Sequence, residues 1–130
     1  MYLWYVDEFH FTLPIDAAFL AGLRHALGTW LENAGIDDRQ RDDLVLATHE
    51  AAANAIEHGA PSDPVWVNAF LLGGEITVEV HDNGQWKTSQ EHSGERGRGL
   101  VLAERLVSHV EILSDAQGTT LRLLCPSAPD

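Results

Sequence analysis

The sequence predicts an α+β fold: a two-layer sandwich in which a mixed, mostly antiparallel sheet is covered on one face by helices. Three observations indicate this class. Two helical runs precede a pair of strand-like runs, those runs meet at a hairpin signal at Gly73-Gly74, and no βαβ unit repeats along the chain. The 130 residues are 45% apolar, which suits one domain whose core needs neither disulfides nor metals. We expect a single domain over residues 1–130, with 126–130 as a loose tail.

The first two elements follow from alternation and helical spacing. Residues 8–13 alternate like a half-buried strand, which Pro14 ends. Asp16 is the expected cap of a helix that stops at Gly35. The apolar positions of that helix recur at helical spacing and are Phe19, Leu20, Leu23, Leu27, Trp30 and Leu31.

A second helix is expected from a cap at Asp37 or Asp38 to Gly59. Its apolar positions, several of which can point toward the core, are Leu44, Leu46, Ala47, Ala51, Ala55 and Ile56. Strands are expected at 65–72 and 75–80, because both glycines of the intervening turn can take positive φ.

The region after residue 82 has no periodicity up to about residue 96, which is typical of a functional loop. A third helix is expected to open at Gly97, with its apolar stripe at Leu100, Ala103, Leu106 and Val107. Strands at 110–113 and 119–124 would complete the sheet.

Charge and composition exclude several classes of protein. Twenty acidic residues against eight basic ones give a net charge of −12, which repels nucleic acid and anionic membranes. No run is long and apolar enough for a membrane span, so we expect a cytoplasmic protein. The lone cysteine, Cys125, is expected to be a small core residue. Because the protein is acidic, a bound nucleotide would need a local source of positive charge or hydrogen-bond donors, such as the N-terminus of a helix.

The second helix carries a polar motif, His49-Glu-Ala-Ala-Ala-Asn-Ala-Ile-Glu-His-Gly59. Glu50, Asn54 and His58 fall at i, i+4 and i+8 and therefore share one face. In this arrangement Asn54 can offer a neutral oxygen to Mg²⁺, and Glu50 can accept a proton from an attacking hydroxyl. The alternative is a solvated helix face beside an alanine-rich packing face.

Two further segments carry candidate binding groups. Asp82-Asn-Gly84 follows a strand, and a simple tight turn would predict an immediate returning strand, which residues 85–92 do not form. Asp82 can instead accept a hydrogen bond from an exocyclic amine such as that of adenine, with Gly84 leaving room for the base. Arg96-Gly-Arg-Gly-Leu100, at an expected helix start, supplies N–H groups and two guanidiniums for phosphates.

The order of these motifs resembles the ATP-binding domain shared by gyrase and the histidine kinases, over roughly residues 37–124. The shared features are Glu-x-x-x-Asn on a helix, Asp-x-Gly after a strand, Gly-x-Gly at a helix start, and Gly118-Thr-Thr120 before a strand. Within that superfamily, Glu-x-x-x-Asn-Ala-x-x-His-Gly and Gly-Arg-Gly-Leu are similar to the anti-sigma-factor serine/threonine kinases of bacterial stress and sporulation switches.

The resemblance implies a Bergerat-type sandwich that binds ATP and Mg²⁺ and regulates transcription. It would phosphorylate an anti-sigma-factor antagonist, sequester a sigma factor, or do both. By the resemblance, Asn54 holds Mg²⁺, Asp82 recognises adenine, and Glu50 activates a serine or threonine hydroxyl of the partner protein. The other nucleotide-binding positions that it implies are Gly84 in the adenine pocket, Gly97, Arg98 and Gly99 in the phosphate-binding lid, and Thr119 beside Asp82.

Other outcomes remain open from the sequence. Trp86 stands where the family often has a second glycine, so a non-catalytic, nucleotide-gated protein-binding module is an alternative, as is the ATPase domain of a larger signalling protein. The apolar residues 2–6 are expected to form an interface, and the family comparison implies a homodimer there. The alternatives for this segment are a covered edge strand or disorder.

Overall fold

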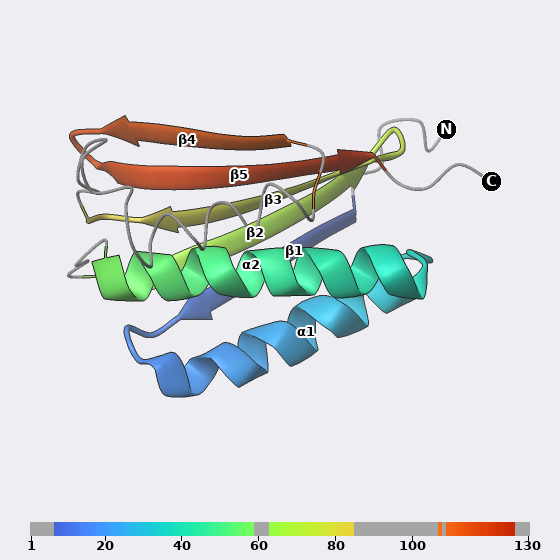
Figure 1. Cartoon of the computed structure of the whole chain (residues 1–130), viewed down its shortest axis with the longest axis horizontal. Coiled ribbons are helices and arrows are strands. Elements are labelled where there is room, and N and C mark those ends of the chain that lie inside the picture. Colours follow the sequence, from blue (N-terminus) through green and yellow to red (C-terminus); the bar gives the residue numbers. More distant parts are fainter. Residues whose placement is uncertain (1–6, 59–62, 85–106, 108, 127–130) are drawn as a thin grey trace.

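The protein is a two-layer sandwich of one sheet and the helices packed on it (Figure 1). The computed structural model describes residues 7–58, 63–84, 107 and 109–126. Within them, five strands form one antiparallel sheet in the order β1-β2-β3-β5-β4. The predicted fold class is confirmed, with every described strand pair antiparallel.

The described elements are close to those predicted. They are β1 (Asp7–Leu13), the 3-10 helix η1 (Ala17–Phe19), α1 (Leu20–Asn33), α2 (Asp38–His58), β2 (Val65–Leu72), β3 (Glu75–Asp82), β4 (His109–Asp115) and β5 (Gly118–Pro126). The third predicted helix and the apolar residues 2–6 lie outside the described residues, although Val107, from that helix's expected stripe, is buried. Pro126, expected in the tail, belongs to β5.

The start of α1 corrects one prediction. Asp16 caps as expected, because its Oδ1 accepts a hydrogen bond from the Ala18 backbone nitrogen at 2.9 Å. The chain then makes a 3-10 turn before the α-helix begins. Phe19 lies in that turn, out of phase with the buried stripe, and is 49% exposed rather than buried. The stripe that packs on the sheet is Leu20, Leu23, Leu27 and Leu31.

Helix α2 presents small residues to the sheet. Asp37 caps it, since its Oδ1 accepts from the Gln40 nitrogen at 2.9 Å. The fully or almost fully buried face consists of Leu44, Ala47, Thr48, Ala51, Ala52 and Ala55. Leu46, expected to be able to face the core, is 41% exposed because it shares the face of Glu50, one turn further along. The alanines let α2 approach the sheet closely.

The two central strands show strict alternation between the faces of the sheet. Gly73 and Gly74 have φ of 59° and 83°, which confirms the predicted hairpin. The residues that point to the helices are Val65, Val67, Ala69, Ile76, Val78 and Val80, and all are buried. The other face carries half-buried side chains such as Trp66 and Phe70 and has no helix on it within the described part of the chain.

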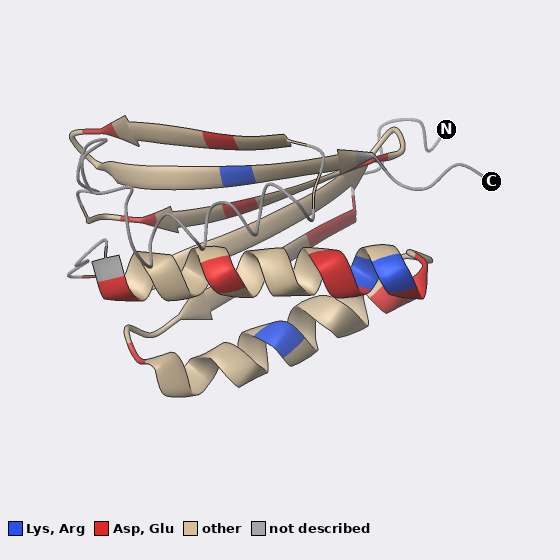
Figure 2. Ribbon diagram, viewed as in Figure 1, with Lys and Arg blue, Asp and Glu red and all other residues tan. Residues whose placement is uncertain are grey.

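Charge is distributed unevenly over this frame. Figure 2 shows acidic residues on both layers, whereas the described Lys and Arg residues lie on α1, on the first turns of α2 and on β5. None of the helices in the described ranges is long and apolar enough to cross a membrane.

Candidate functional site

A buried carboxylate lies where β3 ends. Asp82 is 1% exposed, and its Oδ1 accepts a hydrogen bond of 2.7 Å from the backbone nitrogen of Gly84. A carboxylate is rarely buried to this degree without specific hydrogen bonds or charge partners. The short bond holds the backbone of residues 82–84 around the carboxylate.

Strand β5 supports this position from the side. Thr119 is paired with Asp82 in the β3–β5 register, is 1% exposed, and donates a long hydrogen bond of 3.5 Å from Oγ1 to the carbonyl oxygen of Gly84. Its Oγ1 also lies 3.2 Å from Ser114 Oγ on β4. The predicted proximity of Thr119 to the Asp82 side is therefore observed.

Gly118 lies very close to the backbone at the end of β3. A Cβ at this position would lie 2.0 Å from the backbone oxygen of Asp82 and 2.8 Å from Asn83 Cα, and its φ is 137°. Only glycine fits a contact of this kind. Gly118 was predicted only as part of the Gly118-Thr-Thr120 motif, and its contact with the end of β3 was not predicted.

The second part of the site lies on α2. Asn54 is 6% exposed, and its Nδ2 has no hydrogen-bond partner within the described part of the chain. Glu50, one turn earlier on the same helix face, is half-buried. Helix α2 packs against β3, and Figure 1 shows the end of β3 on the same side of the molecule as the C-terminal half of α2. The fold thus brings Asn54 and Asp82 to one end of the sandwich.

The chemistry of Asn54 fits a bound Mg²⁺-phosphate group. A buried amide nitrogen without a partner costs about 1–3 kcal/mol, and a phosphate oxygen would accept from it while Oδ1 faces the cation. Within the described ranges no group of three or more His, Cys, Asp and Glu side chains gathers.

A neighbouring histidine was not predicted to take part. His49 Nδ1 lies 3.0 Å from Arg24 Nη1, which connects α2 to α1 directly beside Glu50. Burial lowers the pKa of His49, and the nearby Arg24 guanidinium lowers it further. The neutral ring can accept the hydrogen bond from Arg24, so this contact fixes the helix pair rather than supplying a charge.

Some predicted site residues are not placed by the structure. Gly97, Arg98 and Gly99, and also Trp86, lie outside the described residues. His58 is the last residue of α2, and its side chain also falls outside the described part. The phosphate-binding lid therefore stays a prediction.

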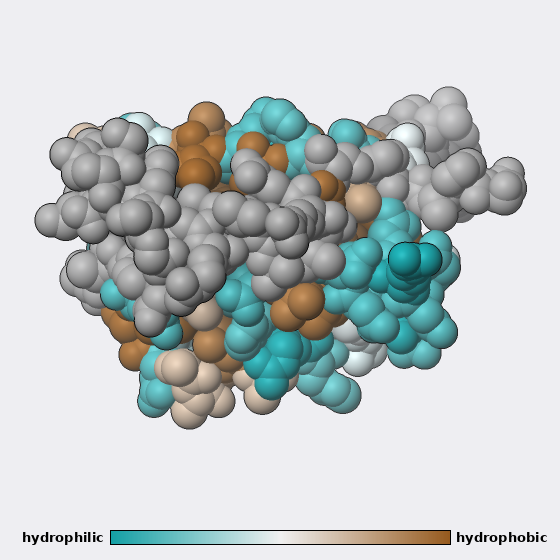
Figure 3. Space-filling model, viewed as in Figure 1, coloured by the Kyte–Doolittle hydropathy of each residue, from teal (hydrophilic) through white to brown (hydrophobic). Residues whose placement is uncertain are grey.

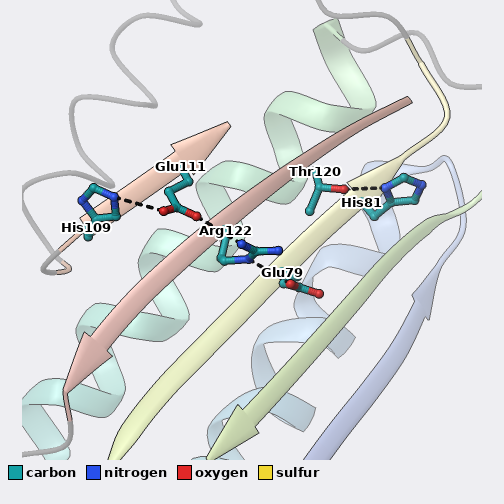
Figure 4. A network of polar contacts seen from close by, with 6 residues as sticks. All are labelled: Glu79, His81, His109, Glu111, Thr120 and Arg122. Atoms are coloured by element: carbon teal, nitrogen blue, oxygen red, sulfur yellow. Dashed lines mark hydrogen bonds and ion pairs between the residues drawn. The ribbon is translucent and has the colours of Figure 1, made fainter. Parts of the chain in front are cut away.

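A second polar cluster lies on the helix-free face of the sheet (Figure 4). Arg122 donates to Glu79 Oε2 at 2.9 Å and to Glu111 Oε1 at 3.2 Å, and His109 approaches Glu111 at 3.4 Å. These groups are partly exposed and bind one another, so they need no ligand to complete them.

A groove between the two helices also lies apart from the predicted site. It has a volume of about 390 Å³ and is lined mainly by Arg24, Gly28, Arg41 and Val45 with their helix neighbours. None of the predicted site residues lines it.

Comparisons with known proteins agree with this fold. Residues 13–125 match the model of a family described as a histidine kinase-like ATPase domain. The structure is similar to that of the RsbU and RsbW domains of Rv1364c from Mycobacterium tuberculosis, with a TM-score of 0.79 and 33% identity over 95% of this chain. The match spans 33% of that longer chain. The SiaB-SiaC complex from Pseudomonas aeruginosa shares the fold, with a TM-score of 0.65 and 15% identity over 89% of this chain and 88% of the matched chain.

Proposed function

Because the chain belongs to the family of histidine kinase-like ATPase domains, we propose that it binds Mg-ATP and is a serine/threonine protein kinase of the anti-sigma-factor type. The observation that carries this proposal is the buried Asp82 at the end of β3. It lies at the same end of the sandwich as Asn54, whose amide nitrogen has no partner among the described residues. A carboxylate can accept a hydrogen bond from the adenine amine, and an amide oxygen can bind the magnesium ion at the phosphate end.

In this proposal each described residue has one task. Asp82 accepts a hydrogen bond from the exocyclic amine of adenine, and Gly84 leaves space for the base. Thr119 keeps the backbone at Gly84 in place. Asn54 binds the magnesium-bound phosphates. Gly97, Arg98 and Gly99 would contact the phosphates from the lid.

Glu50 is the proposed general base. Mg-ATP, when bound, supplies the γ-phosphoryl group. The Glu50 carboxylate accepts the proton of a partner serine or threonine hydroxyl as that oxygen bonds to the γ-phosphorus and the bond to the β–γ bridging oxygen breaks, releasing ADP. The chain's contribution is mainly the alignment of the hydroxyl with the phosphoryl group.

The proposed partners are an anti-sigma-factor antagonist and a sigma factor. One surface that suits a protein partner lies at the beginning of α1, where Ile15 is 41% and Phe19 49% exposed. Figure 3 shows apolar surface over this part of the molecule. Adjacent exposed apolar side chains of this kind mark protein interfaces more often than scattered single ones do. Homodimerisation through residues 2–6 and a cytoplasmic location are further proposals that rest on the sequence alone.

The test of kinase activity is direct. The protein is incubated with Mg-ATP and candidate antagonist proteins, and mass spectrometry identifies phosphate on a serine or threonine. We expect wild type to transfer phosphate and Glu50→Gln, which keeps the shape but cannot take a proton, to lose transfer while still binding nucleotide. The alternative is a nucleotide-gated binding module. Equal, nucleotide-dependent partner release by wild type and Glu50→Gln, without phosphate transfer, would favour that module.

A further inference from the structure

A reciprocal pair of hydrogen bonds lies beside the proposed adenine site. The backbone nitrogen of Asp63 donates to Asn83 Oδ1 at 3.2 Å, and Asn83 Nδ2 donates to Asp63 Oδ2 at 3.1 Å. The two residues are 20 positions apart, so the pair joins two separate segments. Each bond alone is partly solvated, but two bonds in opposite directions fix the orientation of both groups.

The two segments are those that carry the site. Asn83 stands between Asp82 and Gly84, whose backbone nitrogen is bonded to the Asp82 carboxylate. Asp63 lies between α2, the helix of Glu50 and Asn54, and β2. The pair therefore connects the adenine-binding end of β3 with the part of the chain that follows the magnesium-binding helix.

The pair adds to contacts that already hold the backbone of residues 82–84 in place. Gly118 packs so closely against Asp82 and Asn83 that a Cβ there would clash with their backbone, and Thr119 contacts Gly84. The Asn83 side chain supplies a further restraint, from the segment that leads into β2. A carboxylate that must meet one amine needs its backbone held to within roughly 0.5 Å.

We propose that Asn83 and Asp63 form a positioning pair that sets Asp82 for its hydrogen bond to the adenine amine, and that the pair thereby contributes to the choice of adenine over other bases. This inference rests on the proposed function, because it assumes that Asp82 binds that amine. Asn83 acts through Asp82, so it is a positioning residue and not a catalytic one.

Exchanging the two side chains between positions 63 and 83 distinguishes this proposal from a general effect of mutation. Asn83→Asp places a carboxylate opposite the Asp63 carboxylate and removes the Nδ2 donor. In the double variant with Asp63→Asn, the new amide donates to the new carboxylate and the backbone bond remains, with the net charge of wild type restored. The single Asp63→Asn variant completes the double-mutant cycle. Asn68→Asp is the matched control, because it makes the same chemical change on the helix-free face of β2.

The measurement is calorimetric affinity for ADP and for inosine diphosphate, which carries an oxygen in place of the adenine amine. We expect Asn83→Asp to weaken ADP binding by about tenfold, since two like charges now face each other, and to change inosine diphosphate binding by about twofold or less. The double variant should recover ADP affinity to within about threefold of wild type. The control should bind ADP as wild type does.

Three results would overturn the positioning role of the pair. Equal weakening for both nucleotides would show a general repulsion or a loss of structure, and would overturn the proposal. An unchanged ADP affinity in Asn83→Asp, or a double variant as weak as the single one, would also overturn it. If wild type binds neither nucleotide, or binds both equally well, the adenine-recognition part of the proposed function fails first and the pair has no role to play.

Discussion

Two groups of polar side chains in this protein differ in how their hydrogen bonds are completed. At the end of the sandwich shared by β3 and α2, Asp82 and Asn54 are almost fully buried, and the Asn54 amide nitrogen lacks a partner within the described ranges. On the helix-free face, Glu79, Arg122 and Glu111 are partly exposed and bind one another. The first arrangement is costly unless a ligand completes it, whereas the second is complete without one.

We therefore expect the buried groups to matter for ligand binding and the partly exposed groups to contribute only modestly to stability. Substitutions of Asp82 and Asn54 should change ligand binding strongly, and the same chemical changes on the helix-free face should not. The largest expected effect is that of substituting Asp82, the carboxylate proposed to bind the adenine amine.

Asp82→Asn should remove most of the thermal stabilisation that Mg-ADP gives to the wild-type protein. A hydrogen bond to a charged group contributes about 1.5–3 kcal/mol, and the amide can present a donor where the adenine amine needs an acceptor. Differential scanning fluorimetry with and without nucleotide measures the shift. Glu79→Gln makes a matched change on the open face and should keep the full shift; loss of the shift in both variants would contradict the comparison.

Asn54→Ala should weaken the magnesium-dependent part of nucleotide binding by about 1–3 kcal/mol and leave adenine recognition in place. Titrations with ADP in magnesium and in a chelator measure the two parts separately. Equal losses in both conditions would mean that Asn54 supports the fold of the site and does not bind the cation.

Much of this arrangement could be predicted from the sequence. The alternation of β2 and β3 and the glycine pair at Gly73-Gly74 gave the hairpin, because short-range turn chemistry decides it. The predicted family is confirmed by the family match and the likeness in structure. The i, i+4 spacing of Glu50 and Asn54 also placed them on one helix face, which depends only on helical periodicity.

The remaining features depend on tertiary contacts and could not be predicted from the sequence. Phe19 and Leu46 are exposed because the start of α1 and the rotation of α2 on the sheet are set by packing with distant residues. The Asn83 bonds to Asp63 join segments whose approach no local pattern specifies. Gly118 likewise has a contact that only the β4–β5 turn against β3 creates.

Thr48→Val should raise the free energy of unfolding by about 1 kcal/mol. Thr48 is fully buried with an Oγ1 that has no partner within the described residues, and valine has nearly the same shape without the hydroxyl. Urea denaturation measures the change. Thr12→Val, at an exposed position of β1, should change stability by less than about 0.5 kcal/mol. Destabilisation by Thr48→Val would indicate that the hydroxyl is bonded in solution.

Arg122→Gln should have the smallest effect. Removing two partly exposed ion pairs should lower the free energy of unfolding by less than about 1 kcal/mol, with the difference shrinking at high salt. Nucleotide affinity should stay at the wild-type value in calorimetry. A clear loss of nucleotide affinity would show that the helix-free face is coupled to the nucleotide site, and would contradict the independence of the two groups of side chains.

Titration calorimetry of the wild-type protein with Mg-ADP shows whether the end of β3 and the face of α2 form a nucleotide site. We expect saturable binding of one nucleotide per chain, weakened by a chelator and largely lost in Asp82→Asn. Absence of any binding at millimolar nucleotide with magnesium present would contradict it and would leave Asp82 and Asn54 as purely structural groups.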